Sequence, residues 1–194
     1  RQRQMCIRDS IGPATPLMMD TNCTWTLAEA EDIIPKFLHL NLAWLEEPVY
    51  PPDDYLAMKA LRGRGIPIAA GENIGNVMHL RHVVALGALD IVQPSAAKIG
   101  GVSALMESAS ICHAGGAGFH PHSPIYGPGL IATLHVLAVQ DEEASCEFYF
   151  TDLAGCPIGA AHKPVNGYFD LPGGHGLGIE VDESVLKHYA FARS

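Results

Sequence analysis

Three short apolar runs in this chain end in a carboxylate, and the three carboxylates are evenly spaced. Asp20, Glu46 and Glu72 each stand at or within two residues of the end of such a run, and 26 residues separate each acid from the next. A short run that is apolar on both faces is typical of a buried strand. We therefore expect each acid to lie at the carboxyl end of its own strand. The runs are Pro16–Met19, Ala43–Leu45 and Ile66–Ala70.

The segments between the apolar runs carry helix signals. Thr26 and Glu29 form a capping box for a helix that should reach about Leu40, and Pro35 should kink or divide it. Asp53 is predicted to cap a helix that ends near Arg62. Further helices are expected over about Asn76–Leu86, Val102–Ala114, Leu130–Val139 and Asp182–Phe191, and further strands over Ile91–Gln93, Gly118–Phe119 and Ser145–Phe150.

Strands that alternate with helices at this pitch predict an α/β fold with parallel pairing through right-handed crossovers. An open doubly wound sheet and a (β/α)8 barrel both fit. An open sheet uses one switch point for its ligand, whereas a barrel gathers many strand ends at one site. Nearly every strand end here is polar, which favours the barrel. A whole barrel needs about 250 residues, so a 194-residue chain should lack about two βα units on its N-terminal side. The polar strand ends are Asp20, Glu46, Glu72, Ser95 or Lys98, His122 and Glu147.

Composition excludes several classes of partner. The net charge is -9 with only 12 Lys and Arg, and no basic cluster occurs, which argues against nucleic acid. No apolar run approaches the ~20 residues of a membrane span. The five cysteines show no CxxC pair and are interpreted as reduced thiols of a cytoplasmic protein, although a metal-binding role stays open. A small molecule is the expected partner.

Three converging carboxylates would repel one another without a cation. Oxygen ligands alone suit Mg²⁺, which keeps open positions for water and substrate. The histidines typical of catalytic zinc are absent from this spacing. Asp20, Glu46 and Glu72 are therefore predicted to bind Mg²⁺. Trp44, just before Glu46, is interpreted as barrel packing.

Five motifs in this order resemble the enolase superfamily, and within it the mandelate racemase subgroup. The resemblance implies a partial TIM-type (β/α)7β barrel, from the third to the eighth strand, without the N-terminal α+β capping domain. It places the Mg²⁺ ligands of the family at Asp20, Glu46 and Glu72. The motifs are Asp20-x-Asn22, Trp44-Leu45-Glu46-Glu47-Pro48, Gly71-Glu72-Asn73, Lys98-Ile99-Gly100-Gly101 and Gly176-Leu177-Gly178-Ile179-Glu180-Val181.

The same resemblance implies the chemistry: removal of a proton α to a carboxylate, with Mg²⁺ stabilising the enediolate. One base belongs on the second strand, which should be absent here. His122 matches the seventh-strand histidine, with His120 as its competitor, and Glu147 matches an eighth-strand acid. Lys98 joins this catalytic set without being the general base. Asn22, Glu47, Asn73, Ser95 and His120 are predicted to contact the metal ligands or the substrate.

Ser95 departs from the pattern, because the family places an Asp or a Lys base there. Two-base racemisation is therefore less expected than dehydration of a sugar acid to a 2-keto-3-deoxy acid. A racemase or epimerase of a small carboxylate is the alternative, and an inactive truncated chain is another. The intact protein is expected to be a homo-oligomer.

Three segments are expected along the chain. Residues 1–10 have no apolar periodicity, and Met5–Ser10 resembles the translation of a sequencing adapter, so this segment is interpreted as non-native. Residues 11–163 should form the partial barrel. Residues 164–194 should return toward the absent capping domain.

Overall fold

The computed structural model describes residues 2–140, 144–159 and 163–190. Five parallel strands form one sheet in the order β1-β2-β3-β4-β5, which is also their order in the chain. This order is the consequence of repeated right-handed βα units. The α/β class and the parallel pairing are as predicted. The strands are β1 Leu17–Asp20, β2 Leu42–Glu46, β3 Ile68–Ala70, β4 Ile91–Val92 and β5 Gly118–Phe119.

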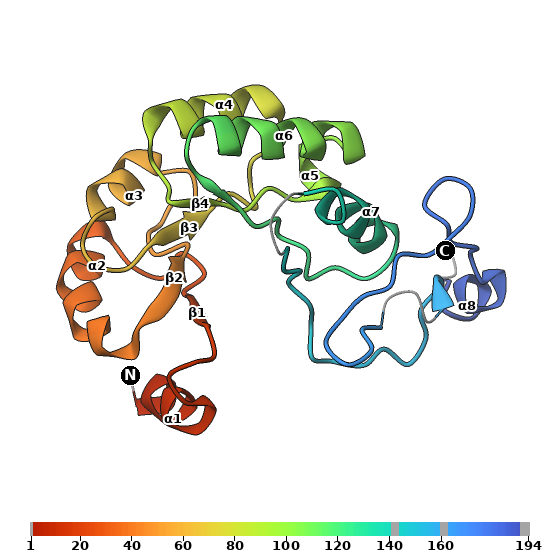
Figure 1. The fold of residues 1–194 in the computed structure, drawn as a ribbon, viewed down its shortest axis with the longest axis horizontal. Coiled ribbons are helices and arrows are strands. Elements are labelled where there is room, and N and C mark those ends of the chain that lie inside the picture. The colour runs from red at the N-terminus through yellow and green to blue at the C-terminus, as the bar shows by residue number, and fades with distance from the viewer. Residues whose placement is uncertain (1, 141–143, 160–162, 191–194) are drawn as a thin grey trace.

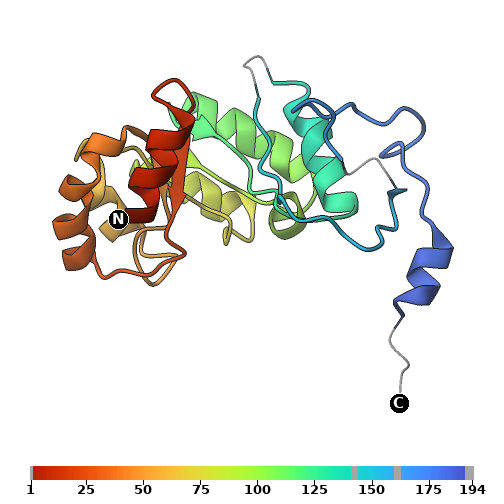
Figure 2. The same cartoon turned by 90° about the horizontal axis from the view of Figure 1, so that it is seen from below.

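The sheet and its helices form an open arc rather than a closed ring (Figure 1). The chain termini lie at opposite ends of the arc, and the turned view agrees (Figure 2). β1 pairs only with β2, so its other edge is unpaired in the described structure. The helical elements are α1 Gln2–Ile11, α2 Leu27–Ile33, η1 Ile34–Lys36, η2 Leu38–Leu40, α3 Tyr55–Leu61, α4 Val77–Leu86, α5 Ala96–Ile99, α6 Val102–Ala114, α7 Pro128–Leu137 and α8 Glu183–His188.

Local signals set several element boundaries. Pro35 divides the predicted long helix into α2 and two 3-10 turns, as expected. Gly87 ends α4 in the left-handed conformation at φ 62°. The predicted cap of α3 was wrong by one residue: Asp54 accepts a hydrogen bond from Ala57 N at 2.9 Å. The helix begins at Tyr55, so the acid that precedes it is the one that reaches the free N–H groups of its first turn.

The strand predicted over Ser145–Phe150 does not form, and this corrects the expected six-strand count. Residues 144–149 have no strand assignment. They contact the residues after β5 through side chains: Ser123 Oγ donates to Glu147 O at 2.9 Å, and His120 Nδ1 lies 3.3 Å from Ser145 Oγ. β5 has only two residues and ends at Phe119. The backbone beyond it therefore offers no ladder with which the segment can pair, and a strand needs such a ladder.

The main core lies between the sheet and its helices. Leu45 and Ile68 from the strands and Met58 and Leu80 from the helices are fully buried there. Among the described residues, no helix is long and apolar enough to cross a membrane. α1 runs through the segment interpreted as non-native, and its Arg8 donates to Leu40 O at 2.9 Å.

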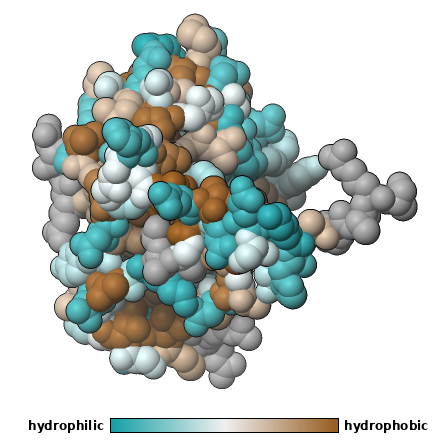
Figure 3. Space-filling model, turned by 90° about the vertical axis from the view of Figure 1, so that its right-hand side faces the viewer, coloured by the Kyte–Doolittle hydropathy of each residue, from teal (hydrophilic) through white to brown (hydrophobic). Residues whose placement is uncertain are grey.

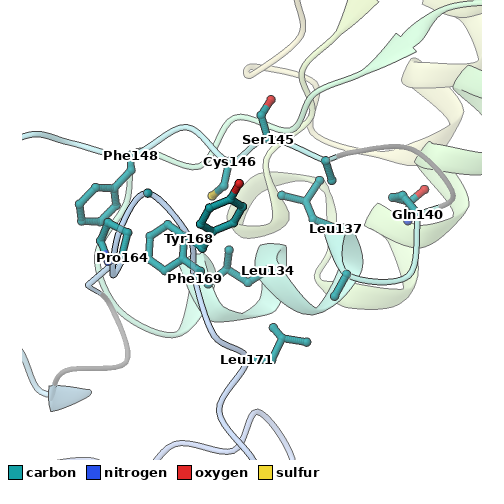
Figure 4. A pocket seen from close by; sticks show the side chains of 13 residues that line it. Leu134, Leu137, Gln140, Ser145, Cys146, Phe148, Pro164, Tyr168, Phe169 and Leu171 are labelled. Carbon is teal, nitrogen blue, oxygen red and sulfur yellow. The ribbon is translucent and has the colours of Figure 1, made fainter.

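The C-terminal segment lies beside α7 and leaves a cavity of about 710 Å³ between them. Leu134 and Leu137 of α7 face Tyr168 and Phe169 across it (Figure 4). The surface at this end of the molecule mixes apolar patches with polar residues (Figure 3). Phe150 is 99% exposed, so part of this apolar surface is open to solvent.

The capping box at α2 gives a test of the local fold. Thr26 N and Glu29 Oε2 are 2.8 Å apart, and Glu29 N donates back to Thr26 Oγ1 at 3.3 Å. The bonds that Thr26 N and Thr26 Oγ1 donate to the Glu29 carboxylate lower the pKa of Glu29. The stabilising effect of this carboxylate is therefore present above the ordinary glutamate pKa and is lost as the pH falls through the lowered value. We expect Thr26→Ala to cost about 1 kcal/mol in urea unfolding at neutral pH. Thr151→Ala, at an exposed position, is the control and should change stability by less than about 0.5 kcal/mol.

Candidate functional site

The ends of β1 and β2 bring Asp20 and Glu46 side by side. The two residues are direct partners in the parallel register. Thr21 N donates to Glu46 O at 3.1 Å, and Cys23 N donates to Glu47 O at 2.8 Å, so the pairing continues past the strands. Thr21 Oγ1 adds a bond to Glu47 O at 2.9 Å. These hydrogen bonds fix the backbone next to Asp20 and Glu46, and so help to position both side chains.

Glu46, Glu72 and His122 form the one cluster of potential metal ligands found in the described part of the chain. One ligand atom from each lies within 4.8 Å of the others. Two of the three predicted metal ligands are therefore together. Asp20 lies outside this compact group, because Asn22 donates to both of its oxygens, from N at 2.8 Å and from Nδ2 at 2.6 Å. Asn22 thus contacts one of the three acids that were predicted as metal ligands.

The carboxylates of the site lie in an environment that disfavours their charge. Burial, first of all, raises the pKa of Glu46, of Asp20 and of Glu47. The neighbouring acids raise these pKa values further, while hydrogen bonds partly offset the effect. A bound cation would remove this penalty. The donor set also fits Mg²⁺, because carboxylate oxygens are the ligands that this ion prefers.

Glu72 is contacted by two cationic groups. Lys98 Nζ lies 3.1 Å from Glu72 Oε1, and His122 Nδ1 lies 3.0 Å from Oε2. His122 Nδ1 is also 3.4 Å from Glu147 Oε2. Burial disfavours the charged imidazole ring, but Glu147 and Glu72 outweigh that effect and raise the pKa of His122. The arrangement therefore favours an imidazolium, which is the form that can act as an acid.

Glu47 and Asn73 are hydrogen-bonded to each other, and Asn73 connects this pair to Lys98. Asn73 Nδ2 donates to Glu47 Oε1 at 3.3 Å, and Lys98 Nζ donates to Asn73 Oδ1 at 3.2 Å. Cys23 Sγ donates to Glu47 Oε2 at 3.3 Å. Burial, with this bond, raises the pKa of Cys23 to about 12, so it stays a thiol near neutral pH. Cys23 was not predicted as a site residue, although its position directly after Asn22 could have indicated that it lies near the site.

The other two predicted residues have different surroundings. The His120 ring packs on Trp44 with centroids 5.1 Å apart, and its Nδ1 lies 3.3 Å from Ser145 Oγ. Ser95 is 1% exposed and stands at the start of α5, a helix that the sequence did not predict. The His122 Nδ1 partners are Glu72 and Glu147 rather than Ser95.

A cavity of about 350 Å³ opens beside Glu46. Two of its residues that contact Glu46 were missed from the sequence. Trp44, interpreted as packing, donates from Nε1 to Glu46 Oε2 at 3.1 Å. Gln93 also hydrogen-bonds Glu46, and its place at the end of an apolar run was the signal that could have found it. The lining residues are Met18, Asp20, Trp44, Glu46, Gln93, His120, Pro121, Ser145, Cys146 and Glu147.

A family model described as enolase C-terminal domain-like matches residues 2–185. The chain belongs to this family. D-galactarolactone cycloisomerase of Agrobacterium fabrum is 30% identical to this enolase-type domain over 197 residues, which cover 94% of the chain and 51% of the relative. The chain thus spans about half the length of the curated relatives it matches. The resemblance inferred from the motifs is confirmed.

Solved structures agree with the enolase-type fold. A mandelate racemase/muconate lactonizing protein from Paracoccus denitrificans, complexed with magnesium, matches with a TM-score of 0.84 and 28% identity, covering 96% of this chain and 50% of its own. L-talarate dehydratase from Polaromonas, complexed with Mg and L-glucarate, matches with a TM-score of 0.79 and 26% identity over 96% and 50% of the two chains. The described sheet therefore corresponds to part of the barrel domain of these proteins.

Proposed function

We propose that this chain carries the Mg²⁺-binding part of an acid-sugar dehydratase, which removes water from a sugar acid to give a 2-keto-3-deoxy acid. The observation that carries the proposal is the grouping of Glu46, Glu72 and His122 within 4.8 Å at the ends of parallel strands. The similarity to a dehydratase complexed with Mg and a sugar acid supports the substrate class.

In this mechanism Asp20, Glu46 and Glu72 would hold Mg²⁺. The bound ion would neutralise the charge that develops on the substrate carboxylate. His122, held as an imidazolium beside Glu72 and Glu147, would give its proton to the β-hydroxyl as the C–O bond breaks and water leaves. The base that takes the α proton is not assigned to any residue that the structure describes. The resulting enol would tautomerise to the keto acid.

Glu147 would support the acid, whereas Lys98 would act on Glu72. Glu147 stabilises the charged ring of His122. Lys98 contacts Glu72 and Asn73, so it limits repulsion between Glu72 and the other carboxylates. Neither role requires Lys98 to accept a proton.

A reaction that isomerises its substrate is the second candidate. The similarity to a cycloisomerase favours it, and racemases and epimerases share the same proton removal. Ser95 argues against the two-base form, since His122 is paired with acids other than the one expected at that position. The two candidates differ in whether a hydroxyl leaves.

The 194-residue chain by itself is proposed to be inactive and poorly soluble. The unpaired edge of β1 and the exposed Phe150 favour association between copies. We propose residues 11–163 as the partial barrel, residues 164–194 as a returning segment and residues 1–10 as non-native. The intact enzyme is proposed to be a cytoplasmic homo-oligomer that acts on a small carboxylate.

Incubation of the intact enzyme with sugar acids in deuterated water tests the reaction. For a dehydratase, we expect loss of water, and a keto acid that carries deuterium where the enol is protonated. Mass spectrometry and NMR measure both. Deuterium exchange into recovered substrate, without water loss, would contradict dehydration and favour an isomerase.

A further inference from the structure

Two uncharged donors hold Glu46. Trp44 Nε1 donates to Glu46 Oε2 at 3.1 Å, and the Gln93 side chain forms a second hydrogen bond to the same carboxylate. Gln93 is only 3% exposed and follows β4, while Trp44 lies in β2 itself. All three side chains line the 350 Å³ cavity. Outer groups of this kind orient a metal ligand and tune its affinity.

The other end of the Gln93 amide lacks a partner. Its Oε1 is buried and accepts no hydrogen bond from the described residues. A carboxylate can only accept, so the amide nitrogen must face Glu46, and this fixes which end is unsatisfied. A buried carbonyl without a donor costs about 1–3 kcal/mol. Such a group is rare in native proteins and requires a donor, which an ordered water or a bound ligand can supply.

We infer that Gln93 is a positioning residue for Glu46, and that its Oε1 accepts a hydrogen bond from an O–H group that enters with the ion. That group is either coordinated water or a substrate hydroxyl. The inference rests on the proposed Mg²⁺ site. It adds a residue that follows β4 to a site whose proposed metal ligands lie in β1, in β2 and just after β3.

Titration of Mg²⁺ into the metal-free intact enzyme by calorimetry tests this role. Gln93→Met keeps the approximate volume and removes both amide groups. We expect its Mg²⁺ affinity to fall about 10–100-fold. Its metal-free thermal midpoint should stay the same or rise, because the unsatisfied oxygen is gone. Gln140→Met is the matched control: it removes the bonds from Nε2 to Val136 O and to Met106 Sδ, outside the 350 Å³ cavity, and should leave the affinity unchanged.

The titration results distinguish failure of the inference about Gln93 from failure of the proposed Mg²⁺ site. Unchanged Mg²⁺ affinity in Gln93→Met, with or without a lower thermal midpoint, would overturn the inference and leave the metal site intact. If Gln93→Met does not fold, Gln93→Asn takes its place, since it keeps the amide but shortens its reach and should also weaken binding. Absence of Mg²⁺ binding by the intact parent enzyme would overturn the proposed function as well.

The source of the O–H group is found by repeating the titrations with two acids. L-glucarate carries hydroxyls, whereas succinate carries none. A further loss of affinity in Gln93→Met that occurs only with L-glucarate assigns Oε1 to a substrate hydroxyl. An equal loss with both acids assigns it to coordinated water.

Discussion

Replacement of Glu46 by Gln is expected to abolish Mg²⁺-dependent turnover in the intact enzyme and to weaken Mg²⁺ binding by more than about 100-fold. The loss of a ligand should exceed the 10–100-fold loss that outer residues cause. Burial raises the pKa of Glu46, so its charge destabilises the folded state increasingly as the pH rises above the ordinary glutamate value. The metal-free thermal midpoint of Glu46→Gln at pH 7 should therefore rise.

Glu31→Gln provides the control for this experiment. Glu31 pairs with Arg64 at 2.6 Å on the surface, so its replacement removes the same charge away from the site. It should leave Mg²⁺ affinity unchanged. If Glu46→Gln bound Mg²⁺ as the parent does, the proposed metal site would be wrong, whatever the effect on stability.

Replacement of His122 by Gln is expected to lower the dehydration rate of the intact enzyme by about 10²–10⁴-fold, the range for loss of a general acid. Mg²⁺ affinity should change little or increase, because a positive group beside Glu72 is removed. Steady-state kinetics and calorimetry on the same preparation measure the two quantities. The expected result is a loss of dehydration activity without a loss of Mg²⁺ affinity.

His120→Gln decides between the two histidines. The His120 ring packs on Trp44 rather than between two acids, so we expect a smaller loss of rate. A larger loss in His120→Gln than in His122→Gln would reverse the assignment. A parallel fall of rate and Mg²⁺ affinity in His122→Gln would instead make His122 a metal ligand, which its distance from Glu46 and Glu72 permits.

Much of the fold could be predicted because its signals are local. The capping box at Thr26, the division at Pro35 and the stop at Gly87 each depend on a few neighbouring residues. The even spacing of Asp20, Glu46 and Glu72 indicated repeated βα units. Parallel pairing then brings strand ends to one edge, so the meeting of Glu46 and Glu72 followed from the pattern.

Other features depended on contacts between distant segments. Residues 144–149 alternate and are rich in β-formers, yet pairing requires a neighbouring ladder that β5 does not provide. The Asp20 oxygens face Asn22 through hydrogen bonds, and His122 faces Glu72 and Glu147 through charge attraction, so contacts in space set these side-chain directions. The spacing of residues along the sequence does not predict these side-chain directions.

The sequence by itself determined the alternation of strands and helices, the family and the acids at the strand ends, since these follow from periodicity and from motifs. Only the tertiary structure decided which groups surround each acid. Trp44 and Gln93 are 49 positions apart in the chain. They meet at Glu46 because Trp44 lies in β2, Gln93 follows β4, and both strands border β3. The physical reason is that hydrogen bonds and burial act over a few ångströms in space, whatever the separation along the chain.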